Sequence, residues 1–541
     1  DAAPPARDAD SPTGPDAPGE KSDAAQPLSP TRAPAHDEIE TTLEAADAAN
    51  RQHLADQVAA VRAPLLADLD ARGIQPVAVS PTAPLLYVEV PKSEILSLAQ
   101  RPDVDTVYPP NDNVDLMNDA KPTQKADVVE AWGYEGTGIS VAILEDSRIE
   151  FDNPYLDLGG SSLSDTVRDS TDSNVDQHAT ATGGMVASQH GTQEGIAQGV
   201  DLYSANATTY NDGDLSDAMD WAVSKNMDII NNSWGGNVGN TDLNDHDRHL
   251  DYIVRYEADS VTVAAGNEAN TCGNGSGRVA SPARGYNVIS VGGYNDQNTT
   301  TWDDDTTYVC SSFVDPSTGV EKPEVAASGA NIVSTSDNSS DWIEGAGSGT
   351  SYAAPMVAAE TALLLERDTS LKTYPETVKA VIMATALHNI EGDTELSDID
   401  GAGGVDMRAA FHLVDEGWWN WDNVQESDFP YTYTQYAHTG ETVRAVIAWN
   451  SNPASDYSSD PLEADLDLRV YDGDGDFVTS STSFNNSYEI VEFDAPATGY
   501  YHFRISEFTF AGTNEFVGFA FWPGHRGLTA YDPEVYDTPD R

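Results

Sequence analysis

The chain has 541 residues, enough for several domains and a sizeable core, and 90 acidic against 27 basic residues give it a formal net charge of −63. Charge of this sign disfavours binding to nucleic acid. The longest apolar stretches have the length of core helices, so no segment is predicted to span a membrane.

The chain begins with two segments that differ in composition and in hydrophobic pattern. Residues 1–37 are rich in Pro, Ala, Asp and Ser without apolar periodicity, which predicts a disordered tail. Residues 38–118 predict a small α+β module. Its elements are a helical pattern over 39–69, strands at 75–80 and 85–90, a helix at 92–100 and a strand at 104–108.

A buried parallel strand is predicted at 138–144, where the residues are almost all apolar. It leads directly into Glu145 and Asp146. Open α/β sheets place their active sites at the carboxyl ends of their strands, so this acidic pair is a candidate for chemistry.

Two later segments carry groups that an acyl-transfer site uses. His178 opens a small-residue helical pattern, HATATGG, although a lone histidine is more often structural. The predicted strand at 261–265 leads into Gly266 and Asn267. An amide at this position could donate to an oxyanion, and it could equally serve only the turn.

The stretch 349–355, GTSYAAP, places Ser351 between a glycine turn and an apolar helical pattern at 356–365. A hydroxyl at a helix start lies near unpaired N–H groups and the positive end of the helix dipole, where developing negative charge is stabilised. The alternative is that this serine only caps the helix.

The order acid, histidine, serine is that of subtilisin-type enzymes, and from about Lys121 to Trp418 the chain resembles the subtilase family. Further segments share the resemblance: 195–205, 228–236, 281–283 and 322–329. It implies an α/β fold over residues 119–418, with a mostly parallel sheet covered by helices on both faces. It also implies a serine endopeptidase that forms an acyl-enzyme and needs no cofactor for the chemistry.

The resemblance assigns Ser351 as nucleophile, His178 as general base and Asn267 as oxyanion donor. At the acid the chain departs from the family pattern, because Glu-Asp-Ser-Arg stands where Asp-Ser/Thr-Gly is usual. Counting from the strand selects Glu145, whereas counting back from Asn153 selects Asp146, so a bulge or insertion is implied. We favour Asp146, which keeps the shorter carboxylate, and Glu145 is the alternative.

The resemblance also implies a substrate site for proteins or peptides. Ser233, Trp234 and Gly235 would pair with the substrate backbone. The pocket for the side chain before the scissile bond would be lined by Ala264, Ala265 and Gly266. A roomy pocket for large apolar side chains is expected. Alternative functions are a dedicated maturation protease or transpeptidase, and a non-catalytic surface or binding protein, suggested by the irregular acidic corner.

The module over 38–118 resembles subtilase propeptides, which predicts a zymogen cut between Asn113 and Lys121. The chain begins without Met or an apolar leader, so we expect that an export signal has been removed and that the protein is secreted. We also expect it to be a monomer. Its charge resembles that of secreted proteins from salt-loving archaea, because concentrated salt screens such self-repulsion. An acidic exported bacterial protein is the alternative.

Cys272 and Cys310 could form a disulfide or stay free.

After Trp418 the pattern alternates between apolar and polar residues at 442–449, 465–471 and 501–506, which predicts a β-sandwich over 419–541, similar to jelly-roll-like domains appended to some subtilases. It could stabilise the enzyme or hold substrate or a cell surface. Asp465, Asp467 and the acidic turn 472–476 offer oxygen ligands for structural calcium, but in so acidic a chain a solvated turn is the alternative.

Overall fold

The computed structural model describes residues 59–79, 86–88, 90–104, 117–156, 163–209, 211–236, 239–270, 272–391 and 396–524. The tail predicted over 1–37 and nearly all of the strand predicted at 104–108 lie outside these residues. The chain divides into two compact units, one within Ser11–Asn113 and one that contains everything from Val114 onward. Each unit is described by itself.

In the residues that the structure describes, the first unit has two helices and a two-stranded sheet. A helix over 59–71 precedes the antiparallel strands β1 (Pro76–Val79) and β2 (Leu86–Val88), and helix α2 (Lys92–Ala99) follows. Arg72 joins the two helices, because its guanidinium contacts both Asp68 and Glu94 at 2.8 Å.

The second unit is built on a mostly parallel sheet, as the sequence predicts. Its strands run side by side in the order β4 (Asp201–Asn206), β3 (Ser140–Glu145), β5 (Ile229–Asn232), β6 (Ser260–Ala264) and β7 (Ile289–Asn295). Strand β9 (Val325–Ser328) lies parallel to β7, and the short β8 (Thr306–Thr307) is antiparallel to it. Nearly every residue of these strands is buried, including polar residues of β4 and β5, as expected for a parallel sheet that is covered on both faces.

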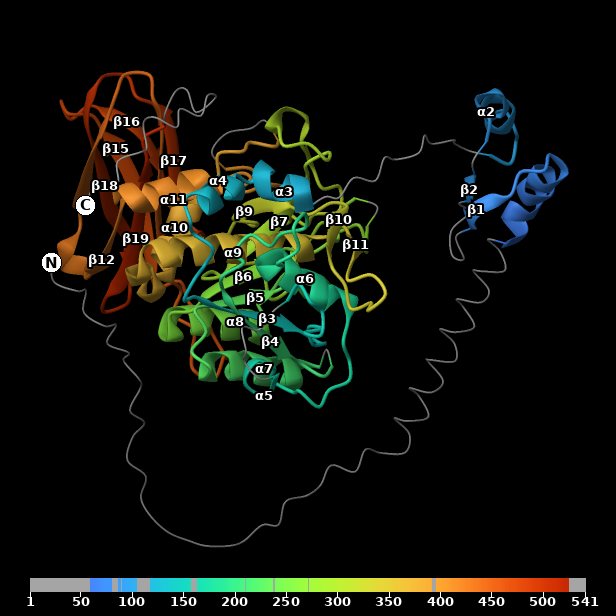
Figure 1. Cartoon of the computed structure of the whole chain (residues 1–541). Coiled ribbons are helices and arrows are strands. Elements are labelled where there is room, and N and C mark those ends of the chain that lie inside the picture. The colour runs from blue at the N-terminus through green and yellow to red at the C-terminus, as the bar shows by residue number, and fades with distance from the viewer. Residues whose placement is uncertain are drawn as a thin grey trace, which may run out of the picture. The chain divides into compact units, whose positions relative to one another are not determined.

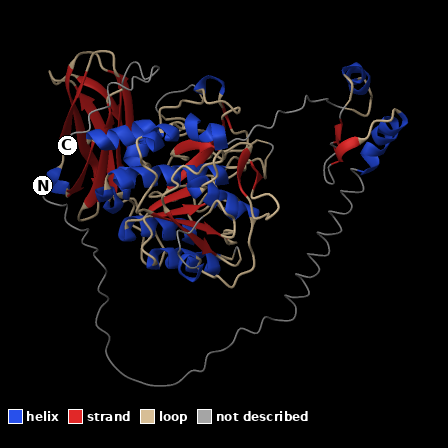
Figure 2. Cartoon of the chain, in the orientation of Figure 1, coloured by secondary structure: helices blue, strands red, loops and turns tan. Residues whose placement is uncertain are grey.

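Helices cover both faces of this sheet (Figures 1 and 2). Residues alternate along β3, so that Val141 and Ile143 belong to one apolar cluster and Ala142 and Leu144 to another. The first cluster includes residues of α4 (Ala126–Ala131), α6 (Gln177–Ala187), α9 (Thr350–Arg367), α10 (Pro375–Ala384) and α11 (Met407–Glu416), whereas the second includes α7 (Asp212–Ser224) and α8 (Asp245–Tyr252).

Short elements connect these layers. They are α3 (Met117–Thr123), α5 (Leu163–Thr166), the π-helical turn η1 (Ile253–Glu257), the 3₁₀ turns η2 (Trp302–Asp304) and η3 (Thr369–Thr373), and the antiparallel pair β10 (Ile332–Thr335) and β11 (Ile343–Gly347).

The C-terminal strands form a sandwich of two antiparallel sheets, which confirms the predicted β-sandwich. One sheet has the order β12 (Trp419–Val424), β19 (Glu515–Trp522), β14 (Thr442–Trp449) and β17 (Tyr488–Asp494). The other has the order β13 (Tyr431–Ala437), β18 (Gly499–Phe510), β15 (Ala464–Tyr471) and β16 (Phe477–Ser481), with the 3₁₀ turn η4 (Glu426–Asp428) before β13.

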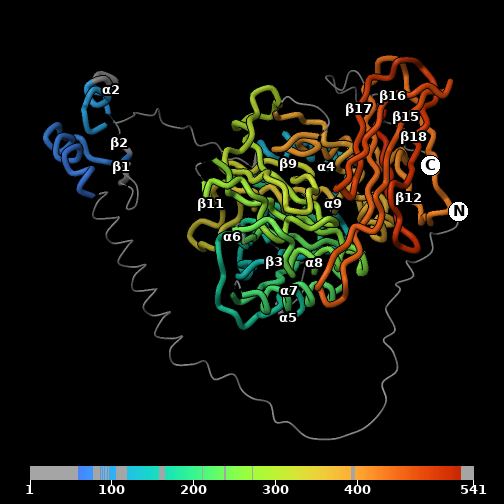
Figure 3. The backbone as a smooth tube through the Cα atoms, turned by 180° about the vertical axis from the view of Figure 1, so that it is seen from behind, coloured from blue at the N-terminus to red at the C-terminus, as the bar shows by residue number. Residues whose placement is uncertain are grey.

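The first of these sheets packs against α10, so the sandwich lies directly on the α/β domain (Figures 1 and 3). The approach is close at Gly518, where a Cβ would lie 2.5 Å from the Thr377 Cα. Arg444 of β14 donates to the carbonyl oxygens of Ala386 and Ala402 at 2.7 and 2.8 Å. The two domains therefore share one continuous interior.

The calcium candidates of the sandwich make other contacts. Asp467 pairs with Arg469 at 2.8 Å, and the Asp472 carboxylate accepts the N–H groups of Asp474 and Asp476. The described residues contain no cluster of three side chains suited to a metal ion. None of the helices that the structure describes is both long and apolar enough to cross a membrane.

Candidate active site

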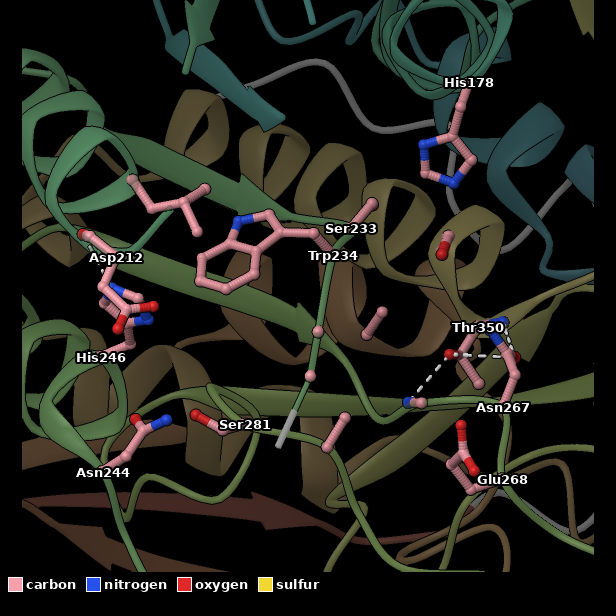
Figure 4. Close-up of a pocket in the computed structure, with 17 residues that line it drawn as sticks. His178, Asp212, Ser233, Trp234, Asn244, His246, Asn267, Glu268, Ser281 and Thr350 are labelled. Atoms are coloured by element: carbon pink, nitrogen blue, oxygen red, sulfur yellow. Dashed lines mark hydrogen bonds between the residues drawn. The ribbon is translucent and has the colours of Figure 1, made fainter. Parts of the chain in front are cut away.

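A cavity of about 680 Å³ opens where the parallel strands end. His178, Asn267 and Ser351 all line it, together with Ser233, Trp234 and Gly235. Figure 4 shows His178, Thr350 and Asn267 at one end and Asp212 and His246 at the other. The carboxyl ends of β5 and β6 and the first turns of α6 and α9 therefore meet at one site, as expected for an open α/β sheet.

His178 is held through both its backbone and its side chain. It is the second residue of α6, and its N–H donates to the Asp176 side chain that caps this helix, at 2.7 Å. Its ring Nδ1 lies 3.2 Å from Oε1 of Glu145, close enough for an ion pair, although Oε1 is not aligned as a hydrogen-bond acceptor. Catalytic hydrogen bonds are often long or poorly aligned in a free enzyme.

The carboxylate beside the His178 ring belongs to Glu145, which the sequence analysis gave as the alternative acid. The structure therefore differs from our preference for Asp146. The ladder between β3 and β4 runs without a register shift through Glu145, so no bulge precedes it. Glu145 is the last residue of β3, is fully buried and contacts the His178 ring. Asp146 follows the strand, and its charge raises the His178 pKa less than the charge of Glu145 does.

The carboxylate changes the acidity of the ring. Burial lowers the pKa of His178, but the charge of the adjacent Glu145 carboxylate outweighs this, with smaller help from Asp176, and the pKa rises from 6.5 to about 8. The Nδ1–H tautomer, which faces the carboxylate, leaves Nε2 as the basic nitrogen.

Ser351 lies in the first turn of α9, where the backbone N–H groups have no partner within the helix. Thr350, the residue before it, fixes this turn. Its N–H donates to Asn267 Oδ1 at 2.9 Å, and its hydroxyl accepts the Gly266 N–H at 3.0 Å. Because Oδ1 is occupied in this way, the Asn267 amide nitrogen is free to donate, and no described residue accepts from it.

Comparisons of the sequence with known proteins identify a family. The sequence profile of the subtilase family matches residues 136–403. Subtilisin of Bacillus pumilus is 31% identical over 255 residues, which are 45% of this chain and 82% of that protein. The chain belongs to the subtilase family.

Other relatives match a smaller share of their own length. Subtilisin E of Bacillus subtilis is 31% identical over 45% of this chain and 59% of that protein, so the match leaves about two fifths of it uncovered. The minor extracellular protease Epr of Bacillus subtilis is 28% identical over 53% of this chain and 44% of that protein. Among solved structures, the serine protease of Aeromonas sobria covers 73% of this chain and 89% of its own, with 15% identity and a TM-score of 0.40.

The walls of this subtilase cleft contain most of the expected substrate residues. Ser233, Trp234, Gly235, Ala264 and Gly266 line the cavity. Ala265 is fully buried and does not, since its N–H and carbonyl are bonded to Val291 and Ala280 in the neighbouring backbone.

The structure adds lining residues that sequence reasoning missed: Asp212, Leu215, Gly236, Asn244, His246, Glu268, Ala280, Ser281 and Thr350. Thr350 and Glu268 are direct neighbours of Ser351 and Asn267, so adjacency was an available signal. Asp212 and His246 come from the starts of α7 and α8, and nothing in their local sequence marks them.

The two cysteines, left open above, form a disulfide between Cys272 and Cys310. The Ala269 N–H donates to the Cys310 carbonyl at 3.1 Å, so the bridged loops also pair through their backbones. Since Asn267 and Glu268 directly precede Ala269, this cross-link stiffens one wall of the cleft.

Proposed function

We propose that this subtilase is a serine endopeptidase that hydrolyses peptide bonds through an acyl-enzyme on Ser351. The observation that carries the proposal is the His178 ring, held by a buried Glu145 on one side and facing a cavity shared with Ser351 and Asn267. A serine hydroxyl is a weak nucleophile until such an imidazole accepts its proton.

In this mechanism His178 Nε2 takes the Ser351 proton as Oγ attacks the substrate carbonyl carbon. The Asn267 amide and the Ser351 N–H then stabilise the oxyanion, aided by the dipole of α9. The imidazolium gives its proton to the leaving amine. Water, activated by the same ring, hydrolyses the acyl-enzyme. Glu145 stays ionised throughout and fixes the tautomer and orientation of the ring.

A fluorophosphonate probe tests this proposal directly. Wild-type protein should be labelled on Ser351, and the Ser351→Ala variant should not. Ser281→Ala is the matched control, because Ser281 lines the same cavity and has no role in the chemistry. Labelling that persists in Ser351→Ala would reject Ser351 as the nucleophile, and labelling that is absent from folded wild type would favour a binding protein over an enzyme.

We further propose that the protein is secreted and works in concentrated salt. The name of its relative Epr describes an extracellular protease, and a net charge of −63 is tolerated best where ions screen it. Unfolding on dialysis from 3 M to 0.1 M NaCl is the expected result. Unchanged circular dichroism and activity at low salt would contradict it.

The segment over 38–118 is proposed to be a propeptide, supported by its compact α+β unit ahead of the α/β domain. Active protein should then begin between Asn113 and Lys121. N-terminal sequencing of the active form measures this, and an amino terminus before residue 38 on active enzyme would contradict it.

A further inference from the structure

Tyr352, the residue after the nucleophile, packs against the ring of the general base. It is the third residue of α9, and its side chain is buried in the first apolar cluster. The centres of the Tyr352 and His178 rings lie 5.4 Å apart, with their planes tilted by 49°. Aromatic rings at separations of about 4.5–7 Å attract each other, so this contact favours one orientation of the imidazole. Ser351 lines the cavity and Tyr352 does not, which leaves the space for substrate free.

The far end of the Tyr352 side chain is fixed by a hydrogen bond. Its hydroxyl donates to the Ala346 carbonyl oxygen of β11 at 2.7 Å. Burial raises the pKa of Tyr352 to about 12, and the charge of Glu145 adds to this rise, so the hydroxyl keeps its proton and remains a donor at neutral pH. The ring is therefore held at one end by its own helix and at the other end by a strand.

Strand β11 is itself joined to the helix that carries the imidazole. It pairs with β10, and two hydroxyls of β10 donate to carbonyl oxygens of α6. The Ser334 hydroxyl donates to the Ala181 carbonyl at 2.9 Å. The Thr335 hydroxyl donates to the Thr180 carbonyl at 2.7 Å. The backbone of α6, the two strands and Tyr352 thus form a closed ring of contacts that returns to the imidazole on the same helix.

The imidazole needs support beyond its carboxylate partner. The torsion that turns a histidine ring about its Cβ–Cγ bond has broad minima, so the side chain alone does not fix the direction of Nε2. Glu145 does not fix it fully either, because its Oε1 lies 3.2 Å from Nδ1 without being aligned as a hydrogen-bond acceptor. The His178 side chain also borders the open cavity, which leaves the ring room to turn. The contact with Tyr352 restricts that movement.

We infer that Tyr352 is a positioning residue that holds the general base in its working orientation. It acts through the His178 ring, keeping Nε2 directed toward Ser351 when the ring takes the serine proton and toward the leaving amine when the ring gives that proton up. This inference rests on the proposed function and adds to it a residue that makes and breaks no bond itself. A misplacement of about 1 Å in a reacting group can lower the rate about 10²-fold, so a ring that is free to turn should be costly.

The test compares two substrates with the same peptidyl group, an anilide and a p-nitrophenyl ester. The amine that leaves from the anilide must receive a proton from the ring, whereas the nitrophenolate of the ester leaves without one. Tyr352→Phe keeps the aromatic ring and removes the hydrogen bond to β11. It should lower kcat/KM about tenfold for the anilide and about two- to threefold for the ester, with the KM of the anilide near the wild-type value. Tyr352→Leu removes the ring contact as well and should lower the anilide rate about 10²-fold.

Tyr308→Phe is the matched control. The Tyr308 hydroxyl donates to the Ser348 carbonyl oxygen at 3.3 Å, so this change also removes a hydrogen bond between a tyrosine and the segment that leads into α9. In the described residues, the ring that contacts His178 is that of Tyr352 and not that of Tyr308. Both rates of this variant should therefore stay near wild type. Complete labelling with a fluorophosphonate counts the intact sites of each variant, so that all rates refer to folded enzyme.

Two results with Tyr352→Phe would overturn the inference and leave the proposed function standing. Equal losses for the anilide and the ester would show a merely structural role, and unchanged rates for both would show no role. A wild-type protein that cleaves neither substrate and takes up no label would overturn the inference and the proposed function together.

Discussion

Two of the imidazole–carboxylate pairs that the structure describes, His178–Glu145 and His388–Asp305, differ in what surrounds them. His178 and Glu145 are 3.2 Å apart at the edge of the cleft, with the histidine side chain 32% exposed and the glutamate 1%. His388 and Asp305 are 2.6 Å apart and almost completely enclosed, at 2% and 0% exposed. Trp302 stacks on the His388 ring at 4.7 Å, and Tyr294 meets it edge-on at 5.2 Å.

The comparison shows that the pair itself does not make a catalytic site. Both pairs have the chemistry of a base fixed by an acid, but only the His178 ring opens onto a cavity that also holds a serine and an amide donor. The enclosed pair joins the loop after β7 to the segment after α10, so its role is to hold the fold together. Access to a reacting partner separates the two roles.

The largest expected effect separates Glu145 from its neighbour. Glu145→Gln should lower kcat by about 10⁴-fold, because the ring loses the carboxylate that fixes its tautomer and stabilises its charged form. Asp146→Asn should change kcat only a few-fold. Steady-state hydrolysis of one peptide by both purified variants measures this, and a greater loss in Asp146→Asn would restore our original preference.

A second prediction concerns the Asn267 amide, which lines the same cavity as His178. Asn267→Ala should lower kcat by roughly 10²–10³-fold, the loss found when the corresponding kind of donor is removed from a subtilisin. KM should change little, because the donor acts mainly on the transition state. A rise in KM at constant kcat would mean that Asn267 binds substrate and does not stabilise the oxyanion.

The enclosed pair should respond in the opposite way. His388→Gln should lower the free energy of unfolding by about 3–5 kcal/mol, because it leaves Asp305 buried without its partner. Turnover per folded molecule should stay close to wild type. Denaturant unfolding combined with active-site titration measures both quantities, and a large fall in kcat per titrated site would contradict the assignment of a purely structural role.

The smallest effect is a pH dependence. Since only neutral His178 can accept the serine proton, kcat/KM should rise about tenfold per pH unit up to the pKa near 8 and then level off. The ion pair with Glu145 stabilises the folded state fully below pH 6.5, and this contribution is lost as pH rises through about 8. An NMR titration of the ring should show a lower pKa in Glu145→Gln, because burial then acts without the opposing charge. An unchanged pKa would show that another group raises it.

The sequence was informative where chemistry follows directly from a strand end or a helix start. Ser351, His178 and Asn267 each stand at such a position, and the structure brings them to one cavity. The same local reasoning could not choose between Glu145 and Asp146, because the choice depends on how far the ladder with β4 continues.

Other features depended on contacts between distant segments. Asp212 and His246 reach the cleft only through the packing of α7 and α8, and the pairing of Cys272 with Cys310 needed the three-dimensional distance. Alternating strands did predict the sandwich. They did not predict that one of its sheets would pack on α10, because amphipathic periodicity identifies a buried face without naming its partner.

The shared interior has a consequence for how this protein can be divided. Tyr488 and Trp522 of the sandwich belong to the same apolar cluster as Val378 and Val381 of α10. A shortened chain that stopped at Trp418 would expose the apolar surface of α10 to water. The C-terminal strands therefore cannot be removed without exposing part of the core. From Val114 to the end of β19, the molecule should melt as one cooperative body with a single heat-absorption peak.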